Sequence, residues 1–259
     1  MRFVYILMIA LLALSCSESK MLQKSLNNFN SPIGYLHDSQ ITDVPPTDSL
    51  IIRLNNYSLD SLTRVTHLKG LVLPFIIFNY IEVNMGVKLG QMSIQEPYND
   101  FFAGSLAEES QRTGCFGISD RESSDSLYTF EINIDTCTTK SQYRRTTMFM
   151  YLFFAYSMSY SELGFPAETN LQVSTKLWKG NALITEKRYS IKRKQPFIQT
   201  GQVNGDKLRS NFTANMVESL SLSTKECIEE MVRDINSSIK LDKNSRVASV
   251  KSNEGEQNK

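Results

Sequence analysis

The residues that could do chemistry in this 259-residue chain are few, and their spacing matches no familiar catalytic motif. Histidine occurs twice, at His37 and His67, and the sequence contains no nucleophile elbow, phosphate loop or His-Glu-x-x-His zinc motif. Adjacent carboxylates such as Glu108 and Glu109 do not face one site on a helix. We therefore expect no catalytic residue, no metal site and no cofactor. A pair of carboxylates from distant strands, as in a hydrolase, is the alternative that the sequence leaves open.

Four cysteines are present, and neither they nor the two histidines form the closely spaced ligand pairs of a zinc ribbon or finger. Cys115, Cys137 and Cys227 allow three disulfide pairings, or three buried thiols that behave as small apolar groups. If residues 120–126 form a tight hairpin turn, Cys137 lies about 20 Å along the strand from the partner of Cys115. That register disfavours a Cys115–Cys137 disulfide.

The composition excludes two further classes of protein. Hydrophobic residues make up 41% of the chain, enough for a packed core, so the chain is not disordered throughout. Lys and Arg number 28 against 27 Asp and Glu. Because proteins held on nucleic acid need a basic excess, we expect no nucleic-acid partner.

The N-terminus has the pattern of an export signal. Arg2 precedes an unbroken apolar run from Phe3 to Leu14. As a helix this run spans roughly 18 Å, short of the roughly 30 Å of a bilayer core, so it fits a signal peptide better than a spanning helix. Ser15 and Cys16 follow directly. The segment Ala13-Leu14-Ser15-Cys16 resembles the lipobox of bacterial lipoproteins, in which small residues precede a modified cysteine.

This resemblance implies that the chain is cut before Cys16 and that Cys16 carries a thioether-linked diacylglycerol, with a further acyl group such as palmitate on its amino group. Two or more acyl chains anchor a protein stably. Ser17 is not the aspartate that retains some lipoproteins in the inner membrane, which favours the outer membrane. The alternatives are an ordinary cleaved signal peptide and a short uncleaved anchor.

The chain divides into four parts by composition. Residues 1–15 are the expected signal peptide, and residues 16–48, rich in Ser, Asn and Asp, read as a lipidated tether. Residues 49–239 contain the apolar periodicity of a single domain. Residues 240–259 are polar and predict a disordered tail.

Hydrophobic periodicity predicts the elements of the domain. The expected elements are a buried strand over 70–83, a helix from Pro97 to Gly114, strands over 115–118 and 128–134, a hairpin of 171–177 with 183–191, a helix over 208–220 and a second helix from a capping box at Ser223 and Glu226. This order predicts an α+β fold, with a mixed or antiparallel sheet, helices packed on one face and helices at the C-terminal end.

Three segments resemble envelope lipoproteins, such as auxiliary lipoproteins of ABC-type transporters and outer-membrane assembly factors. These segments are PYNDFFAGSLAEESQRTGCF, LFFAYSMSYSELGFP and NLQVSTKLWKGNALITEKRY. The resemblance implies a non-catalytic role at a membrane and assigns no functional residue.

The most aromatic segment, residues 148–165, is a candidate surface for a lipid or an envelope protein partner. The candidate contact residues are Phe149, Tyr151, Phe153, Phe154 and Tyr156. The alternative is a helix or loop packed on the sheet.

A basic cluster near the end of the predicted hairpin is a candidate contact for phosphate headgroups or an acidic partner. It consists of Arg188, Lys192, Arg193 and Lys194, with Arg188 and Lys192 on one strand face. The alternative is a solvated strand end that discourages edge pairing.

The sequence thus favours a lipid-anchored protein of the cell envelope that binds or assembles, in lipid transport or outer-membrane biogenesis, and interacts with the membrane through Cys16. The alternative function is a periplasmic hydrolase with a carboxylate site.

Overall fold

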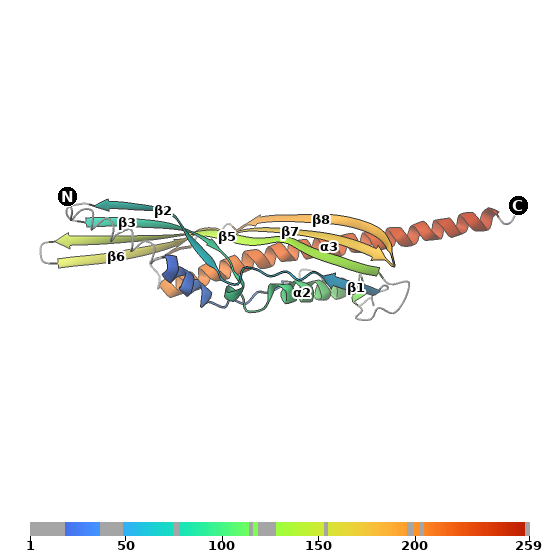
Figure 1. Cartoon of the computed structure of the whole chain (residues 1–259), viewed down its shortest axis with the longest axis horizontal. Coiled ribbons are helices and arrows are strands. Elements are labelled where there is room, and N and C mark those ends of the chain that lie inside the picture. The colour runs from blue at the N-terminus through green and yellow to red at the C-terminus, as the bar shows by residue number, and fades with distance from the viewer. Residues whose placement is uncertain are drawn as a thin grey trace.

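The chain folds as one long sheet with a helix along one face, seen in a computed structural model (Figure 1). The structure describes residues 19–36, 49–74, 78–113, 116–118, 128–152, 155–195, 199–201 and 205–256. The α+β class, the mostly antiparallel sheet and the C-terminal helix are confirmed.

Nine strands form the sheet. They are β1 (Ser49–Leu54), β2 (Arg64–Pro74), β3 (Phe78–Lys88), β4 (Gly117–Ile118), β5 (Tyr128–Leu152), β6 (Ala155–Gly164), β7 (Glu168–Lys179), β8 (Ala182–Lys194) and β9 (Gln199–Gly201). The helical elements are residues 19–27, η1 (Gln91–Ser93), α2 (Tyr98–Arg112) and α3 (Gly205–Glu256).

Strand β5 organises the sheet because its 25 residues extend about 80 Å, far longer than an ordinary strand. Its first half lies between β1, which runs parallel to it, and β7. Its second half lies between β3 and β6, both antiparallel. The sheet therefore has two halves that share only β5, one widened by β8 and β4 and the other by β2 and β9.

Helix α3 covers one face of the sheet, where it contacts β5, β6, β7, β8 and β9, and it also packs against α2 (Figure 1). Its buried side chains include all those that the sequence periodicity predicts: Leu208, Phe212, Met216, Leu220, Cys227, Ile228, Met231 and Ile235. At its start Gly164 of β6 allows close contact, since a Cβ there would lie 2.7 Å from the Phe212 ring. The ends of β2, β3, β5 and β6 project beyond the start of α3 (Figure 1).

The prediction of two C-terminal helices is wrong, because α3 is continuous. The Ser223 hydroxyl donates to the Ser219 carbonyl at 2.8 Å, a bond made inside a helix, so Ser223 is not an N-cap. The helix also continues through residues 240–256, where the sequence predicts a disordered tail. No glycine or proline occurs between Asp206 and Glu254 to end it. The Lys179 ammonium donates to Asp242 at 2.5 Å and ties this region to the sheet.

Two apolar segments are hairpins, contrary to the sequence predictions. The expected single strand over 70–83 is split between β2 and β3. The aromatic segment 148–165, expected as a helix or loop, contains the end of β5 and all of β6. Sequence periodicity fails in both because long apolar runs do not alternate, and pairing with distant strands decides the conformation. Pro74 lies on edge strand β2, as predicted.

The local signals for α2 and for the β7–β8 hairpin are confirmed. Pro97 immediately precedes α2, and Gly180 has a positive φ of 56° in the turn between β7 and β8. The expected pairing of segment 115–118 with segment 128–134 is wrong, because β1 lies between β4 and β5 and pairs with both.

Much of the predicted tether packs on the domain. Leu22, Leu26 and Ile33 are buried in the core. The Ser31 amide donates to the Ser93 carbonyl at 3.0 Å, and the Ser221 hydroxyl on α3 donates to the Gly34 carbonyl. These few apolar residues lie among polar ones, which is why the sequence suggests free chain. Among the described helices none is both long and apolar enough to cross a membrane.

The approach of Gly90 to the chain before β2 gives a stability prediction. A Cβ at Gly90 would lie 2.2 Å from the Leu62 carbonyl carbon, which is backbone and cannot rotate away. We expect Gly90→Ala to lower the free energy of unfolding by about 3 kcal/mol or more in urea denaturation. The control is Gly104→Ala on the exposed face of α2, where no atom lies within 4 Å; it should raise stability by about 0.5–1 kcal/mol. Equal effects from the two variants would contradict the packing at Gly90.

The two described cysteines, Cys137 and Cys227, are buried free thiols. Burial raises the pKa of Cys137 and that of Cys227 to about 12. We expect neither to react with iodoacetamide in the folded protein at about pH 8.5, where an exposed thiol is about half ionised. Peptide mass spectrometry measures the labelling, and the same reaction in urea should modify both. Labelling of Cys137 at the same rate in both conditions would show that it is not buried.

The raised pKa values of these two thiols predict that the folded protein loses stability at alkaline pH. Their pKa is higher in the folded state, so the stability they contribute is complete below about pH 9 and is lost as the pH rises towards about 12. The free energy of unfolding, from urea titrations across this range, should therefore fall with pH, and less so in a Cys137→Ala variant.

Candidate functional site

A band of charged residues crosses the sheet where it emerges from under α3. Residues that pair across neighbouring strands form rows perpendicular to the strands. Lys69, Asn84 and Arg144 share one row, Arg145 and Glu162 share the next, and Glu82 lies in the third. We call the five ionisable residues of these three rows the charged belt: Lys69, Glu82, Arg144, Arg145 and Glu162.

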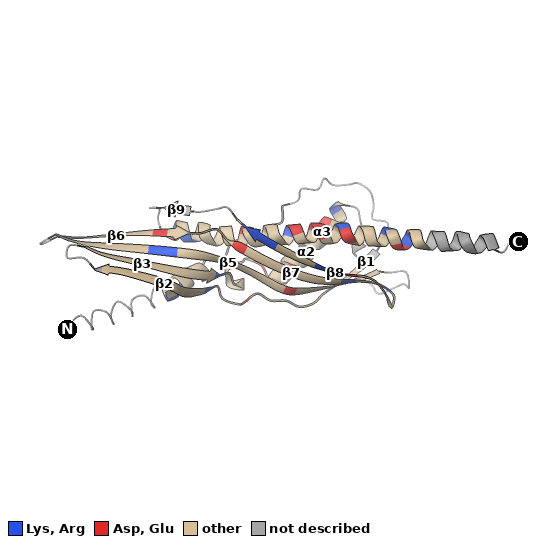
Figure 2. Ribbon diagram, turned by 90° about the horizontal axis from the view of Figure 1, so that it is seen from above, with Lys and Arg blue, Asp and Glu red and all other residues tan. Residues whose placement is uncertain are grey.

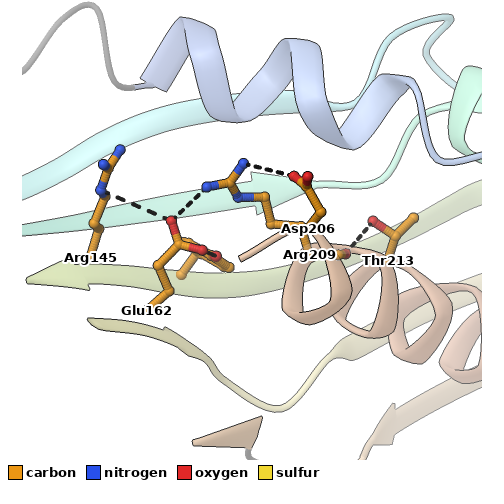
Figure 3. Close-up of polar contacts among 6 residues, drawn as sticks. Arg145, Glu162, Asp206, Arg209 and Thr213 are labelled. Atoms are coloured by element: carbon orange, nitrogen blue, oxygen red, sulfur yellow. Dashed lines mark hydrogen bonds and ion pairs between the residues drawn. The ribbon is translucent and has the colours of Figure 1, made fainter. Parts of the chain in front are cut away.

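On the α3 face of the belt, the carboxylate of Glu162 is the centre of a buried polar cluster (Figure 3). Arg209 Nη2, from the first turns of α3, donates to Glu162 Oε1 at 2.8 Å. Arg145 Nε lies 4.0 Å from the same oxygen, and the Tyr143 hydroxyl donates to Oε2 at 2.5 Å. The Glu162 side chain is only 4% exposed, so these donors replace the water that a carboxylate needs.

The cluster favours the protonated forms of Tyr143 and Arg209. Burial raises the pKa of the Tyr143 hydroxyl, and the hydrogen bond to Glu162 and its charge raise it further. Burial alone would lower the pKa of Arg209, but the hydrogen bond and charge of Glu162 outweigh that effect and raise it. Asp206 makes a second, exposed ion pair with Arg209 at 3.5 Å (Figure 3). The arrangement holds α3 to β5 and β6.

A cavity of about 60 Å³ lies beside this cluster. Its lining comes from the N-terminal helix, β3, β5, β6 and α3: Met21, Leu22, Met85, Tyr143, Arg145, Glu162 and Arg209. It has room for a few water molecules. One carboxylate with its donors already bound offers no acid and base pair, and the described residues contain no group of three or more potential metal ligands.

On the opposite face of the sheet, side chains of the belt and its neighbours are linked by a series of hydrogen bonds. The Tyr80 hydroxyl and the Asn84 amide donate to the two oxygens of Glu82 at 2.8 and 2.9 Å. Arg144 Nε donates to Asn84 Oδ1 at 2.9 Å, and its guanidinium lies over the Phe165 ring. These bonds hold the pKa of Glu82 below its usual range. Both faces of the sheet therefore carry satisfied charge at this level.

Beyond the belt the sheet carries no charged residue. We call this part the uncharged end: residues 70–74 of β2, 78–81 of β3, 146–152 of β5 and 155–161 of β6. Figure 2 shows the strands coloured for charge at the belt and without charge colours from there to their ends. Large apolar side chains are exposed on the uncharged end: Leu71, Val72, Leu73, Met150, Met158 and Tyr160.

The exposed side chains of the uncharged end lie on both faces of the sheet. Val72, Met158 and Tyr160 lie on the face that α3 covers further along, in register with residues of β3 and β5 on that side. Leu71, Leu73 and Met150 lie on the opposite face by the same alternation. Met158 and Tyr160 are 55% and 51% exposed.

The predicted aromatic surface falls on this uncharged end. Phe149 is half-buried on β5 and in register with Met158. The backbones of Tyr151 and Tyr156 pair with each other, while their side chains, and Phe153 and Phe154 altogether, lie outside the described residues. The sequence prediction placed the charge-free stretch over 70–81 in one buried strand, and so did not include it in the candidate surface. It also passed over Ser157 to Ser161, which alternate polar and apolar residues as strands do.

The predicted basic cluster on β8 is divided between the two faces of the sheet. Arg188, Lys192 and Lys194 are exposed on the face away from α3. Arg193 faces α3 and forms an ion pair with Glu226 at 3.6 Å. Three of the four residues therefore remain together as a possible anion contact, and the fourth holds the helix.

Cys16 lies outside the described residues, but the chain that follows it is placed. The helix of residues 19–27 begins beside the belt, because Met21 and Leu22 line the cavity with Arg145 and Glu162. The last residues of this helix bond to the packed body of the domain: the Ser93 hydroxyl donates to the Leu26 carbonyl, and Asn27 bonds to Thr63, the residue before β2. The helix therefore runs from the belt away from the uncharged end.

No family model matches the chain, and no curated protein matches it either. Among solved structures, a protein from Xanthomonas campestris assigned to the family model DUF330 is similar in fold. The two are 10% identical, the match covers 83% of this chain and 99% of that chain, and the TM-score is 0.41. A likeness of this size identifies no shared function.

The buried cluster predicts unequal effects of removing its two acids. Glu162→Gln removes the buried charge that Arg209 and Arg145 both face, and leaves Arg209 with the exposed Asp206; we expect it to lower the free energy of unfolding by about 2–3 kcal/mol. Asp206→Asn is the control, because the Asp206 side chain is 77% exposed and its ion pair contributes little. Urea denaturation of both variants measures the difference. A Glu162→Gln variant as stable as the control would contradict the buried ion pair.

Proposed function

We propose that this chain is a membrane-anchored lipoprotein of the cell envelope that acts as a non-catalytic binding or assembly subunit. The observation that carries this proposal is the uncharged end of the sheet. Soluble proteins seldom expose apolar side chains together over a large area unless the surface binds something. Depletion of charge is also what distinguishes the centre of a binding surface from the rest of a protein.

The buried cluster supports a binding role over a hydrolytic one. A hydrolase site needs two carboxylates converging on a polar pocket, and the cavity beside the belt offers one. The Glu162 carboxylate accepts hydrogen bonds from Arg209 on α3 and from Tyr143 on β5, so it joins the helix to the sheet. This arrangement is suited to fixing α3 on the sheet.

The anchor is supported by two features of the sequence and one of the structure. The apolar run of Phe3 to Leu14 followed by Ser15 and Cys16 resembles a lipobox. The domain also begins to fold within a few residues of Cys16, because Leu22 is already buried. A lipid on Cys16 would therefore hold the domain itself close to the membrane. Lipid transport and outer-membrane biogenesis are the envelope processes in which we place this subunit, with the outer membrane favoured by Ser17.

Mass spectrometry of the native chain tests the anchor. We expect its first peptide to begin at Cys16 and to carry the mass of a diacylglycerol with a further acyl chain. A Cys16→Ala variant should lack that mass, whereas Cys137→Ala, which removes a buried thiol, should keep it. A native chain that retains Met1, or carries an unmodified thiol at Cys16, would contradict the proposal.

A further inference from the structure

We infer that the uncharged end of the sheet inserts into the outer part of a lipid leaflet, with the charged belt at the level of the headgroups. The anchored position of the domain rests on the proposed function, while the insertion itself rests on the distribution of charge and apolar side chains in the sheet. The ligand is a lipid bilayer of ordinary phospholipids.

The distribution of the exposed side chains favours a lipid over a protein partner. Val72, Met158 and Tyr160 lie on one face of the uncharged end, and Leu71 and Leu73 lie on the other. A protein that docks on a sheet covers one face, and leaves the other in water. A leaflet surrounds both faces at once, so it removes all of these side chains from water.

The uncharged strand ends are short enough to stay within one leaflet. Thr146 to Leu152 of β5 extend about 23 Å beyond Arg145. One leaflet offers about 15 Å of hydrocarbon and about 5–8 Å of headgroup region. The absence of charge over residues 70–81 and 146–161 removes the large cost of placing an ionised side chain in that region.

The belt has the composition of a membrane interface. It contains three basic and two acidic residues, and Glu82, Arg144, Arg145 and Glu162 are hydrogen-bonded or ion-paired. Tyrosines lie at the same level, since Tyr80 donates to Glu82 and the Tyr160 ring lies 5.8 Å from the Arg145 guanidinium. Tyrosine and arginine side chains, each with an apolar body and a polar end, concentrate at the boundary between acyl chains and water.

The position of the N-terminal helix gives an independent reason to place lipid here. Met21 and Leu22 lie beside the belt, and the helix runs from there away from the uncharged end. Cys16 precedes Ser19 by three residues, which reach at most about 11 Å. An acyl group on Cys16 is therefore attached near the level of the belt, in the same leaflet that the uncharged end enters.

The open edges of the sheet limit the depth of insertion. In the described residues β2 pairs only with β3, and β6 pairs with β9 only from Glu162 to Gly164. Unpaired backbone groups in hydrocarbon cost several kcal/mol each. We therefore place the edges in the headgroup region, with the sheet tilted and its apolar side chains reaching the first part of the acyl chains.

Quenching of tryptophan fluorescence by brominated lipid tests the insertion. The single native tryptophan is removed by Trp178→Phe, and the full chain is reconstituted in phosphatidylcholine vesicles brominated on the acyl chains. We expect Met158→Trp on one face and Leu73→Trp on the other both to lose most of their emission. Lipids brominated near the headgroup end of the chain should quench more than those brominated near the terminal methyl.

The matched control is Leu183→Trp, on β8 at the other end of the sheet, where the side chain is 46% exposed. Its emission should be unchanged by brominated lipid. A thermal melt of each variant confirms folding, and Tyr160→Trp and Leu71→Trp replace a variant that has lost its transition. Quenching on only one face, or at neither Met158 nor Leu73, overturns the insertion.

The outcomes separate this inference from the anchor. If Cys16 is acylated but the uncharged end shows no quenching, the lipid anchor is retained and the insertion is wrong. The uncharged end would then bind a partner protein, a second copy of this chain or the segment before Ser19. Quenching without acylation of Cys16 supports the insertion and removes the lipid anchor from the proposed function.

Discussion

The ion pair between Glu162 and Arg209 fixes the point at which the two halves of the molecule meet. A carboxylate that is almost fully buried must be hydrogen-bonded and paired, and here its partners come from β5 and from the first turns of α3. Buried ion pairs contribute little net stability compared with apolar packing, whereas breaking one is costly. We interpret this cluster as a positional constraint, which sets where α3 begins along the sheet and therefore how much of the sheet it leaves uncovered.

The length of β5 creates that division. A strand of 25 residues is too long for any one pair of neighbours, so β1 and β7 flank its first half and β3 and β6 its second. Helix α3 and α2 bury the first half, where Phe130, Ile132 and Leu177 belong to the core. Among the described residues no helix covers the second half beyond the belt, and Met158 and Tyr160 are exposed there (Figure 1). One continuous strand thus connects a stable, packed body to an exposed apolar end.

Sequence alone could predict the features that depend on neighbouring residues. The helix after Pro97, the turn at Gly180 and the buried stripe from Leu208 to Ile235 follow from local propensity and periodicity, and each is confirmed. The insertion of β1 between β4 and β5 could not be predicted, because it pairs residues more than 60 positions apart. The strands over residues 148–156 could not be recognised from the sequence, because consecutive residues are apolar and the alternation that identifies a strand is missing.

The candidate site was partly predictable for the same reason. The aromatic segment drew attention to β5 and β6, but the belt depends on Glu162 meeting an arginine 47 positions later on α3. The composition of residues 19–36 suggested free chain, because Leu22 and Leu26 are a single apolar pair at helical spacing among mostly polar residues. Contacts with distant residues make the segment part of the domain: Leu22 lines the cavity, and Ser93 bonds to Leu26 and Ser31.

The unpaired edges of β2 and β6 also affect how the molecule behaves when it is taken out of the cell. Over residues 70–74 of β2 and 155–161 of β6, the outer edge has no partner strand among the described residues, carries no charge and has only Pro74 to block pairing. Two such edges on one sheet are able to join molecules into ribbons. Concentrated samples without detergent should therefore lengthen into strand-paired polymers during storage, whereas micelles that cover the same surface should keep the particles single.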